Sequence, residues 1–290
     1  MVDANSSSTL EALQKEYQAL IHGSSAQNTK PRVAAWGLVK AGKSSLLNML
    51  SGHVTDEYFE TGDVRTTRVN QELETDHYIL LDTPGLGIDD EDTQEAYKGL
   101  DSADVILFVH APQGELDQEE IRFLDQICLE YGAEADRRLI IVLTQLDKNK
   151  DQALEKIRDR VLDQIEKGFG IMPQCFLLSN TRYQKGAAEN KQTLIKKSGI
   201  PELAEHLETL VEDIQPDQEQ LRAQRAQAKK DELLDRLGQA MASEQARMLE
   251  IKKIYQKKVV RFNKIMQNLR DEYQHTEKAI ARAQRELENI

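Results

Sequence analysis

The chain has 290 residues, of which 30% are charged and only 5% are aromatic. This length accommodates one domain of ordinary size with further structure beside it, and the composition is typical of a chain with a sizeable solvated helical portion. The formal net charge is −12, although residues 217–290 hold 16 Lys and Arg against 12 Asp and Glu. The rest of the chain is therefore strongly acidic, which disfavours nonspecific binding of nucleic acid because its phosphates are repelled.

The cysteines and the apolar runs bear on the cellular setting. Cys128 and Cys175 are the only cysteines, and each lies in an apolar context, so we expect two buried thiols rather than a metal site or a disulfide. Residues 1–9 are polar and predict no signal peptide, and apolar runs such as Leu139–Leu143 are too short to span a bilayer. We expect a cytoplasmic protein, with a peripheral position at a membrane as the alternative.

The predicted elements begin with an apolar stripe at helical spacing in residues 9–21. We expect an N-terminal helix over residues 8–22 that packs with a C-terminal helical arm. Beyond a polar loop, β-rich apolar segments alternate with polar helical segments. Strands are expected at 33–39, 77–83, 105–111, 139–145 and 175–179, and helices from Leu46, at 117–131, at 151–167 and from Gly199 to Ile214. The alternation predicts an α/β domain over residues 30–214, with a mainly parallel sheet covered on both faces.

Residues 217–290 have a different pattern, with no proline and a single glycine, Gly238. From residue 255 onward, positions in alternating steps of four and three form a heptad seam, which reads Tyr255, Val259, Phe262, Met266, Leu269, Tyr273, Thr276, Ile280, Ala283 and Leu287. The seam predicts a coiled-coil arm that needs a partner helix. Residues 217–250 folded back, the N-terminal helix and another chain are the alternatives for this partner.

The segment GLVKAGKS, from Gly37 to Ser44, lies between a predicted strand and a predicted helix and fits the pattern G-x-x-x-x-G-K-[ST]. Its glycines let backbone N–H groups approach an anion closely, and the following helix adds the partial positive charge of its N-terminus. Lys43 would reach the β- and γ-phosphates of a nucleotide, and Ser44 would ligate Mg²⁺. Gly42 and the neighbouring Ala41 and Ser45 are further candidate phosphate contacts.

Three further segments carry chemistry that suits a nucleotide. Asp82-Thr83-Pro84-Gly85 ends a predicted strand, where the aspartate can hold Mg²⁺ through water and the Gly85 N–H can reach the γ-phosphate. Thr66-Thr67-Arg68 lies in the polar loop before it and offers hydroxyl groups to the metal. Thr144-Gln145-Leu146-Asp147 ends another strand, where a carboxylate can accept two hydrogen bonds from guanine that adenine cannot donate.

The order GxxxxGKS, TTR, DTPG and TxxD resembles the translation-factor (TRAFAC) class of P-loop GTPases, in its Era-like and dynamin-like branches, and most of all a bacterial dynamin-like GTPase. The resemblance covers about residues 31–214. It implies a GTPase (G) domain that binds GTP or GDP with Mg²⁺, with metal ligands Ser44, Thr67 (Thr66 as the fallback) and Asp82. It also implies base recognition by Thr144, Gln145 and Asp147, helped by the loop that contains Ser179 and Asn180.

Gln145 and Lys40 depart from the pattern of these relatives, and Leu86 departs from that of Ras-like GTPases, which have a water-positioning glutamine there. Gln145 stands where the family usually has lysine, so we expect a lower affinity for guanine. Leu86 follows DTPG and cannot orient water, so the catalytic arrangement must come from other groups. Lys40 occupies a P-loop position that relatives use to place a monovalent cation near the phosphates. Its ammonium can take the place of that cation in catalysis, together with Lys43 and Thr67, or it can point into solvent.

The sequence leaves two function classes open. The first is a GTP-hydrolysing, dynamin-like enzyme whose arm mediates self-assembly or binding to a membrane or partner, with turnover that is slow without assembly. The second is a nucleotide-gated switch with a coiled-coil docking arm and little hydrolysis of its own. Expected partners are a guanine nucleotide and a second copy, through the G domain or the arm. A membrane surface or a coiled-coil protein is a further possibility, because the arm carries a basic run from Lys252 to Lys264.

Overall fold

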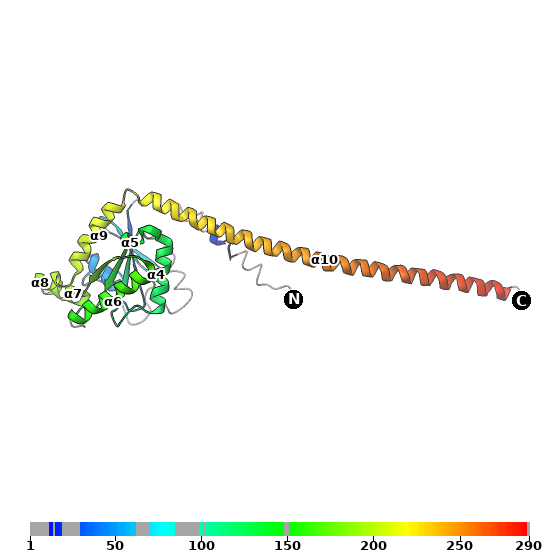
Figure 1. Cartoon of the computed structure of the whole chain (residues 1–290), viewed down its shortest axis with the longest axis horizontal. Helices are drawn as coiled ribbons and strands as arrows, with labels where there is room; N and C mark the ends of the chain where they lie inside the picture. The colour runs from blue at the N-terminus through cyan, green and yellow to red at the C-terminus, as the bar shows by residue number, and fades with distance from the viewer. Residues whose placement is uncertain are drawn as a thin grey trace. The chain divides into compact units, whose positions relative to one another are not determined.

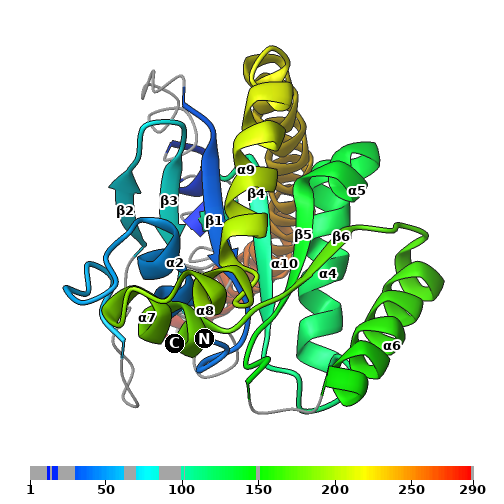
Figure 2. The ribbon, with the colours of Figure 1, turned by 90° about the vertical axis from the view of Figure 1, so that its left-hand side faces the viewer.

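The computed structural model describes residues 12–13, 15–18, 30–61, 70–84, 99–100, 102–147 and 151–288. Its centre is a six-stranded sheet with the order β2-β3-β1-β4-β5-β6 (Figure 2). Five neighbouring strands are parallel, namely β3 (Ile79–Asp82), β1 (Arg32–Trp36), β4 (Val105–His110), β5 (Leu139–Leu143) and β6 (Gln174–Leu177). The sixth strand, β2 (Gln71–Glu74), pairs antiparallel with β3 at the edge. The expected mainly parallel α/β sheet is confirmed.

Alternate side chains of the central strands enter two separate cores. In β1, Val33 and Ala35 belong to one core, whereas Ala34 and Trp36 belong to the other. Side chains of successive strand residues point to opposite faces, so a strand buried on both faces is apolar throughout. This is why the predicted strands appear in the sequence as continuous apolar runs rather than as alternating patterns.

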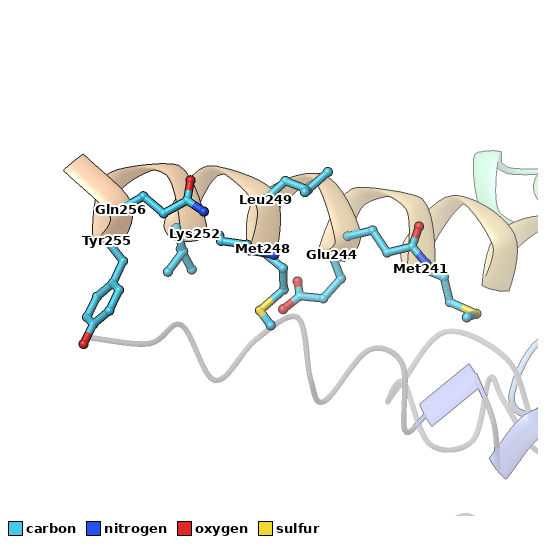
Figure 3. A pocket seen from close by; sticks show the side chains of 9 residues that line it. Met241, Glu244, Met248, Leu249, Lys252, Tyr255 and Gln256 are labelled. Carbon is cyan, nitrogen blue, oxygen red and sulfur yellow. The ribbon is translucent and has the colours of Figure 1, made fainter. Parts of the chain in front are cut away.

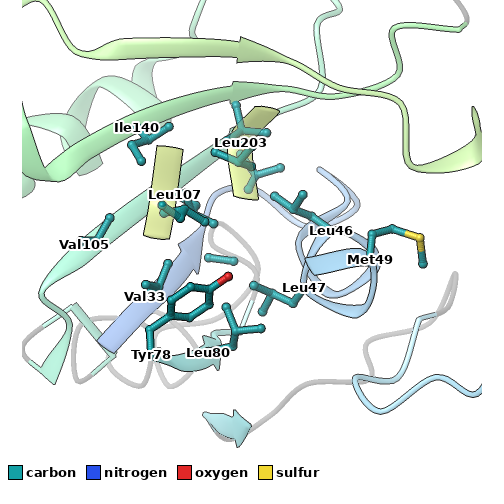
Figure 4. Close-up of a cluster of buried hydrophobic side chains, with 14 of the residues drawn as sticks. Val33, Leu46, Leu47, Met49, Tyr78, Leu80, Val105, Leu107, Ile140 and Leu203 are labelled. Carbon is teal, nitrogen blue, oxygen red and sulfur yellow. The ribbon is translucent and has the colours of Figure 1, made fainter. Parts of the chain in front are cut away.

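Helices cover both faces of the sheet. On one face lie α2 (Lys43–Leu50) and α9 (Ile200–Ile214), whose Leu46 and Leu203 pack with strand residues in the cluster of Figure 4. On the other face lie α4 (Gln118–Tyr131) and α6 (Asp151–Phe169). The short helices η1 (Gly132–Glu134), α5 (Ala135–Arg138), α7 (Asn180–Ala188) and α8 (Gln192–Lys196) complete the described elements of this region.

Two features were not expected from the sequence. Strand β2 reads QELE and alternates between half-buried and exposed positions, so it lacks the apolar run by which the other strands were found. Helices α7 and α8 have little apolar periodicity and are held by contacts with each other, where Gly186 packs closely against Ile195.

The two cysteines, Cys128 and Cys175, were expected to be buried, and the structure shows both as partly buried.

Helix α10 (Gln218–Glu288) is one unbroken helix of 71 residues (Figure 1). One alternative for the partner of the seam is therefore wrong, because residues 217–250 do not fold back. A fold-back needs a helix break, and the segment has no proline; Gly238 costs only about 1 kcal/mol relative to alanine, too little to end a long helix. Within the described residues, no helix combines the length and apolar character needed to cross a bilayer.

The chain divides into two compact units, residues 27–225 and residues 226–290 with 1–26. The first turns of α10 belong to the first unit, where two arginines attach them. Arg222 forms an ion pair with Asp104, the residue before β4, and its Nε donates to Oδ1 at 2.9 Å. Arg225 donates to the carbonyl oxygens of Ala103 and Leu100 at 2.9 and 3.0 Å. In the second unit, Arg236 of α10 lies 3.9 Å from a carboxylate oxygen of Glu16.

Candidate nucleotide-binding site

The loop between β1 and α2 has a backbone that only glycine adopts without strain at two positions. Gly37 has φ of 150°, and a Cβ atom there would lie 2.2 Å from the carbonyl oxygen of Val109 in β4. Gly42 has φ of 100° and directly precedes the first residue of α2, whose first turn contains no acidic side chain. The glycine spacing in the sequence thus produces a loop whose amide groups and helix N-terminus suit an anion.

Lys43 extends back over this loop. Its Nζ atom donates hydrogen bonds to the carbonyl oxygens of Gly37 and Leu38, both at 3.0 Å, and only 7% of the residue is exposed. Burial lowers the pKa of the Lys43 ammonium to about 8, whereas the nearby Asp82 carboxylate acts to raise it. Because this ammonium is poorly solvated, a phosphate beside it would strongly stabilise its charged form.

Ser44 and Asp82 bring two hard oxygen donors together. The Ser44 hydroxyl donates to Oδ2 of Asp82 at 2.7 Å, and Asp82 is fully buried at the end of β3. The hydroxyl of Thr83 donates to the Ala35 carbonyl oxygen at 2.7 Å, which fixes the chain directly after Asp82. Oxygen donors in this arrangement fit Mg²⁺, which is usually held by one or two protein groups together with phosphate and water.

The candidate base-recognition loop is attached to the phosphate loop. Thr144, which follows β5, donates from its hydroxyl to the Ala41 carbonyl oxygen at 2.9 Å. Asn180, the first residue of α7, donates from its side-chain amide to the Gly42 carbonyl oxygen at 3.5 Å. These bonds connect segments more than one hundred residues apart and hold the two loops side by side.

Asp147 is exposed at the surface of this loop, and its carboxylate is oriented by Ser179. The buried Ser179 hydroxyl donates to Oδ1 of Asp147 at 2.5 Å and also accepts from the backbone N–H of Arg182, which makes Ser179 the N-cap of α7. The bond to Oδ1 fixes the orientation of the whole carboxylate of Asp147, as recognition of a base edge requires. The sequence predicts a part for the Ser179 loop in base recognition, whereas the bond from Ser179 to Asp147 depends on the fold.

Backbone strain is concentrated in these two loops. Of three non-glycine residues with positive φ in the described part of the chain, Lys40 (65°) and Gln145 (59°) lie in them, whereas Asn190 does not. Left-handed backbone at such residues costs about 1–2 kcal/mol each and persists where the surroundings enforce it. The Lys40 side chain is exposed and that of Gln145 is half-buried.

The structure brings together most of the candidate residues of the sequence at the end of β3, on the loops that follow β1, β5 and β6, and in the first turns of α2 and α7. They are Gly37, Lys40, Ala41, Gly42, Lys43, Ser44, Ser45, Asp82, Thr144, Gln145, Asp147, Ser179 and Asn180. Thr66, Thr67, Gly85 and Leu86 lie outside the described residues. Their proposed roles in binding metal and γ-phosphate remain predictions.

A buried pair behind the site was not anticipated. His110, the last residue of β4, has Nδ1 at 2.7 Å from Oε1 of Glu120, and its carbonyl oxygen accepts the Thr144 N–H at 3.0 Å. Glu120 also closes the capping box with Asp117 at the start of α4. The spacing D-x-x-E of the capping box was visible in the sequence, but its link to His110 depends on the fold.

The chain has identifiable relatives among known sequences. Residues 32–145 match the family model described as 50S ribosome-binding GTPase. An uncharacterised protein of Acinetobacter baylyi is 36% identical over 183 residues, which cover 61% of this chain and 42% of that protein. GTPase Der of Leptospira borgpetersenii is 32% identical over 136 residues, which cover 42% of this chain and 27% of Der. The chain therefore spans less than half the length of these curated relatives.

Solved structures show the same architecture. Toc33 of Arabidopsis thaliana, in complex with Mg²⁺ and GMPPNP, aligns with a TM-score of 0.50 at 17% identity and covers 70% of this chain and 93% of that chain. A protein from an oligomerised bacterial dynamin pair aligns with a TM-score of 0.50 at 16% identity and covers 99% of this chain and 63% of that chain. At these identities the likeness is one of fold.

Proposed function

We propose that this chain, which carries a P-loop GTPase domain, binds GTP together with Mg²⁺ and hydrolyses it to GDP and phosphate. One observation carries the proposal. The buried Lys43 ammonium lies over the phosphate loop, directly beside a 2.7 Å hydrogen bond between Ser44 and Asp82. A loop with a purely structural role does not require a buried cation, a backbone that only glycine adopts and a pair of oxygen donors in one place.

Each group has a separate task in this proposal. The loop amides and Lys43 bind the β- and γ-phosphates, and Lys43 offsets the charge that develops as water attacks the γ-phosphorus and the bond to the bridging oxygen breaks. Ser44 and Asp82 would hold Mg²⁺, which when bound would neutralise negative charge on the phosphates. Asp147, oriented by Ser179, accepts hydrogen bonds from guanine and excludes adenine.

The helical arm extends the proposal to a dynamin-like enzyme that works in assemblies. The long helix α10 exposes large apolar side chains such as Phe262 and Tyr273, which are 61% and 70% exposed. An arm of this kind favours self-assembly or docking to a membrane or partner in the cytoplasm. The second candidate is a nucleotide-gated switch, and it is favoured by Leu86, which cannot position water for hydrolysis.

A nucleotide titration and a rate measurement test this proposal. Fluorescent GTP and GDP should bind in the presence of Mg²⁺, and ATP should not compete with them. The rate of phosphate release per molecule should then rise with protein concentration for an assembly-stimulated enzyme. A rate per molecule that is low and independent of concentration would support the switch. Equal competition by ATP and GTP would exclude the guanine assignment altogether.

A further inference from the structure

Helix α10 exposes a mainly apolar stripe along the heptad positions. Its members include Met248, Tyr255, Val259, Phe262, Met266 and Leu269, and each of them is between 41% and 68% exposed. Figure 3 shows Met248 and Tyr255 on the same side of the helix, seven residues apart. The stripe thus begins upstream of residue 255, and we call the whole stripe, from Met248 to Ile280, the seam.

We propose that the seam pairs with the seam of a second copy of this chain, and that the two α10 helices run antiparallel with their midpoint at Lys264. This inference deepens the proposed function, because it names the partner that the arm takes in self-assembly. Two independent patterns support this register, one in the core positions of the coil and one in the charges that flank it.

The first pattern concerns the apolar layers. In the proposed register Met248 packs on the partner's Ile280, and Phe262 packs on the partner's Met266. All of these positions carry large, exposed apolar side chains in the single chain. Each such layer occurs twice by symmetry, so the centre of the coil is apolar over several turns on both sides of Lys264.

The polar core positions provide a sharper criterion. Lys252 lies within the seam, and Gln245 occupies the core position directly before Met248. A parallel pair in register would place each of them against its own copy, with two ammonium groups in one layer at Lys252. In the antiparallel register Lys252 lies opposite the partner's Thr276 and Gln245 lies opposite the partner's Ala283. The polar residues Gln245 and Lys252 of one helix are thus placed opposite small or polar residues of the other helix.

The flanking charges select the same orientation. In the antiparallel register Lys258 lies beside the partner's Glu272, and this attractive pair occurs twice, while Ile265 meets the partner's Ile265. In a parallel pair Glu272 would instead lie beside the partner's Glu277, and like charges at these flanking positions are unfavourable. No acidic or basic residue stands three or four positions from Glu272 on its own helix except His275, so Glu272 is available for a partner.

Four basic side chains of the arm do not compete with this pairing. Lys253, Lys257, Arg261 and Lys264 occupy heptad positions outside the seam and its flanks, so pairing leaves them in solvent. A lipid surface would need the positive face, whereas a second copy needs the apolar seam. The observations on the seam therefore favour a second copy as its occupant.

Charge reversal tests the register, with sedimentation velocity on the full chain as the measurement. The unmodified protein should dimerise. Glu272→Lys should raise the dissociation constant about fivefold to tenfold, because two attractive pairs become repulsive. The double variant Lys258→Glu with Glu272→Lys should restore the dissociation constant of the unmodified protein. Glu277→Lys is the matched control and should leave the dimer unchanged; tighter association of both single variants would instead establish a parallel coil and overturn the proposal.

Disulfide trapping tests the orientation. Met248→Cys and Ile280→Cys should each fail to cross-link alone under mild oxidation and should form a covalent dimer when mixed. A parallel pair would give the opposite result. The unmodified protein is the control for Cys128 and Cys175, and burial raises the pKa of both thiols, so they should react slowly.

Two further outcomes separate this inference from the proposed function. A protein that stays monomeric at all concentrations, or that dimerises equally well after Phe262→Ser, overturns the antiparallel coil. Binding to vesicles rich in phosphatidylserine that is lost with Phe262→Ser would assign the seam to lipid and would also overturn it. GTP binding is measured on the same samples, so an intact dimer without GTP binding contradicts the proposed function alone.

Discussion

At the scale of single residues, Lys43 is the strongest test of the phosphate site. Its ammonium is nearly buried and donates to the carbonyl oxygens of Gly37 and Leu38. Lys43→Ala should weaken GTP binding by about 3 kcal/mol, because charge-assisted hydrogen bonds to phosphate are lost, and hydrolysis should vanish. Equilibrium titration with a fluorescent GTP analogue measures the affinity. Lys167→Ala, at an exposed lysine of α6, is the control and should bind like the unmodified protein.

Asp147 tests the choice of base. Asp147→Asn removes a carboxylate that Ser179 holds in place, and an amide cannot accept the two hydrogen bonds that guanine donates. Preference should shift from GTP toward xanthosine triphosphate, whose base has a carbonyl where guanine has its amine. Competition binding with the two nucleotides measures the shift. A variant that still prefers GTP to the same degree would place base recognition elsewhere.

Lys40 tests whether the phosphate loop contains its own cation. Its backbone is held at φ of 65°, and its side chain is exposed. A fixed ammonium near the phosphates would replace a bound potassium ion, so GTP hydrolysis should proceed at equal rates in sodium and potassium buffers. Lys40→Asn should then be slow in sodium and recover in potassium. Strong stimulation of the unmodified protein by potassium would show that Lys40 serves another purpose.

At the scale of elements, the attachment of α10 to the first unit depends on Arg225. Its guanidinium lies 4.3 Å from the centre of the Tyr131 ring and donates to the carbonyl oxygens of Leu100 and Ala103. Arg225→Ala should lower the free energy of unfolding by about 3 kcal/mol, because two buried carbonyl groups lose their donor together with a cation–π contact. Thermal denaturation measures this loss. Arg261→Ala, at an exposed position of the same helix, should change the melting temperature little.

At the scale of the whole molecule, the seam and the nucleotide site should be separable. Replacing Phe262, Met266 and Leu269 by serine removes the apolar contacts of the coil, each contributing roughly 1.5–3 kcal/mol when fully buried. Helix content should fall by circular dichroism, because most of the stability of a helix in a protein comes from packing of its apolar face. Nucleotide binding should persist, since none of the three residues lies in the compact unit of residues 27–225. Unchanged helicity would mean that the stripe contributes nothing to folding of the arm.

The sequence by itself determined the features that depend on local chemistry. Continuous apolar runs identified the five parallel strands, because burial on both faces excludes polar residues. Glycine spacing identified the loop of Gly37 and Gly42, because a positive φ there excludes other residues. Tertiary structure alone decided what depends on partners distant in the chain. The edge strand β2 exists because β3 offers it hydrogen bonds, and Asp147 is oriented because the fold places Ser179 beside it. The first turns of helix α10 attach to the first unit because the fold places Asp104 and Tyr131 beside Arg222 and Arg225, and no local pattern connects these residues.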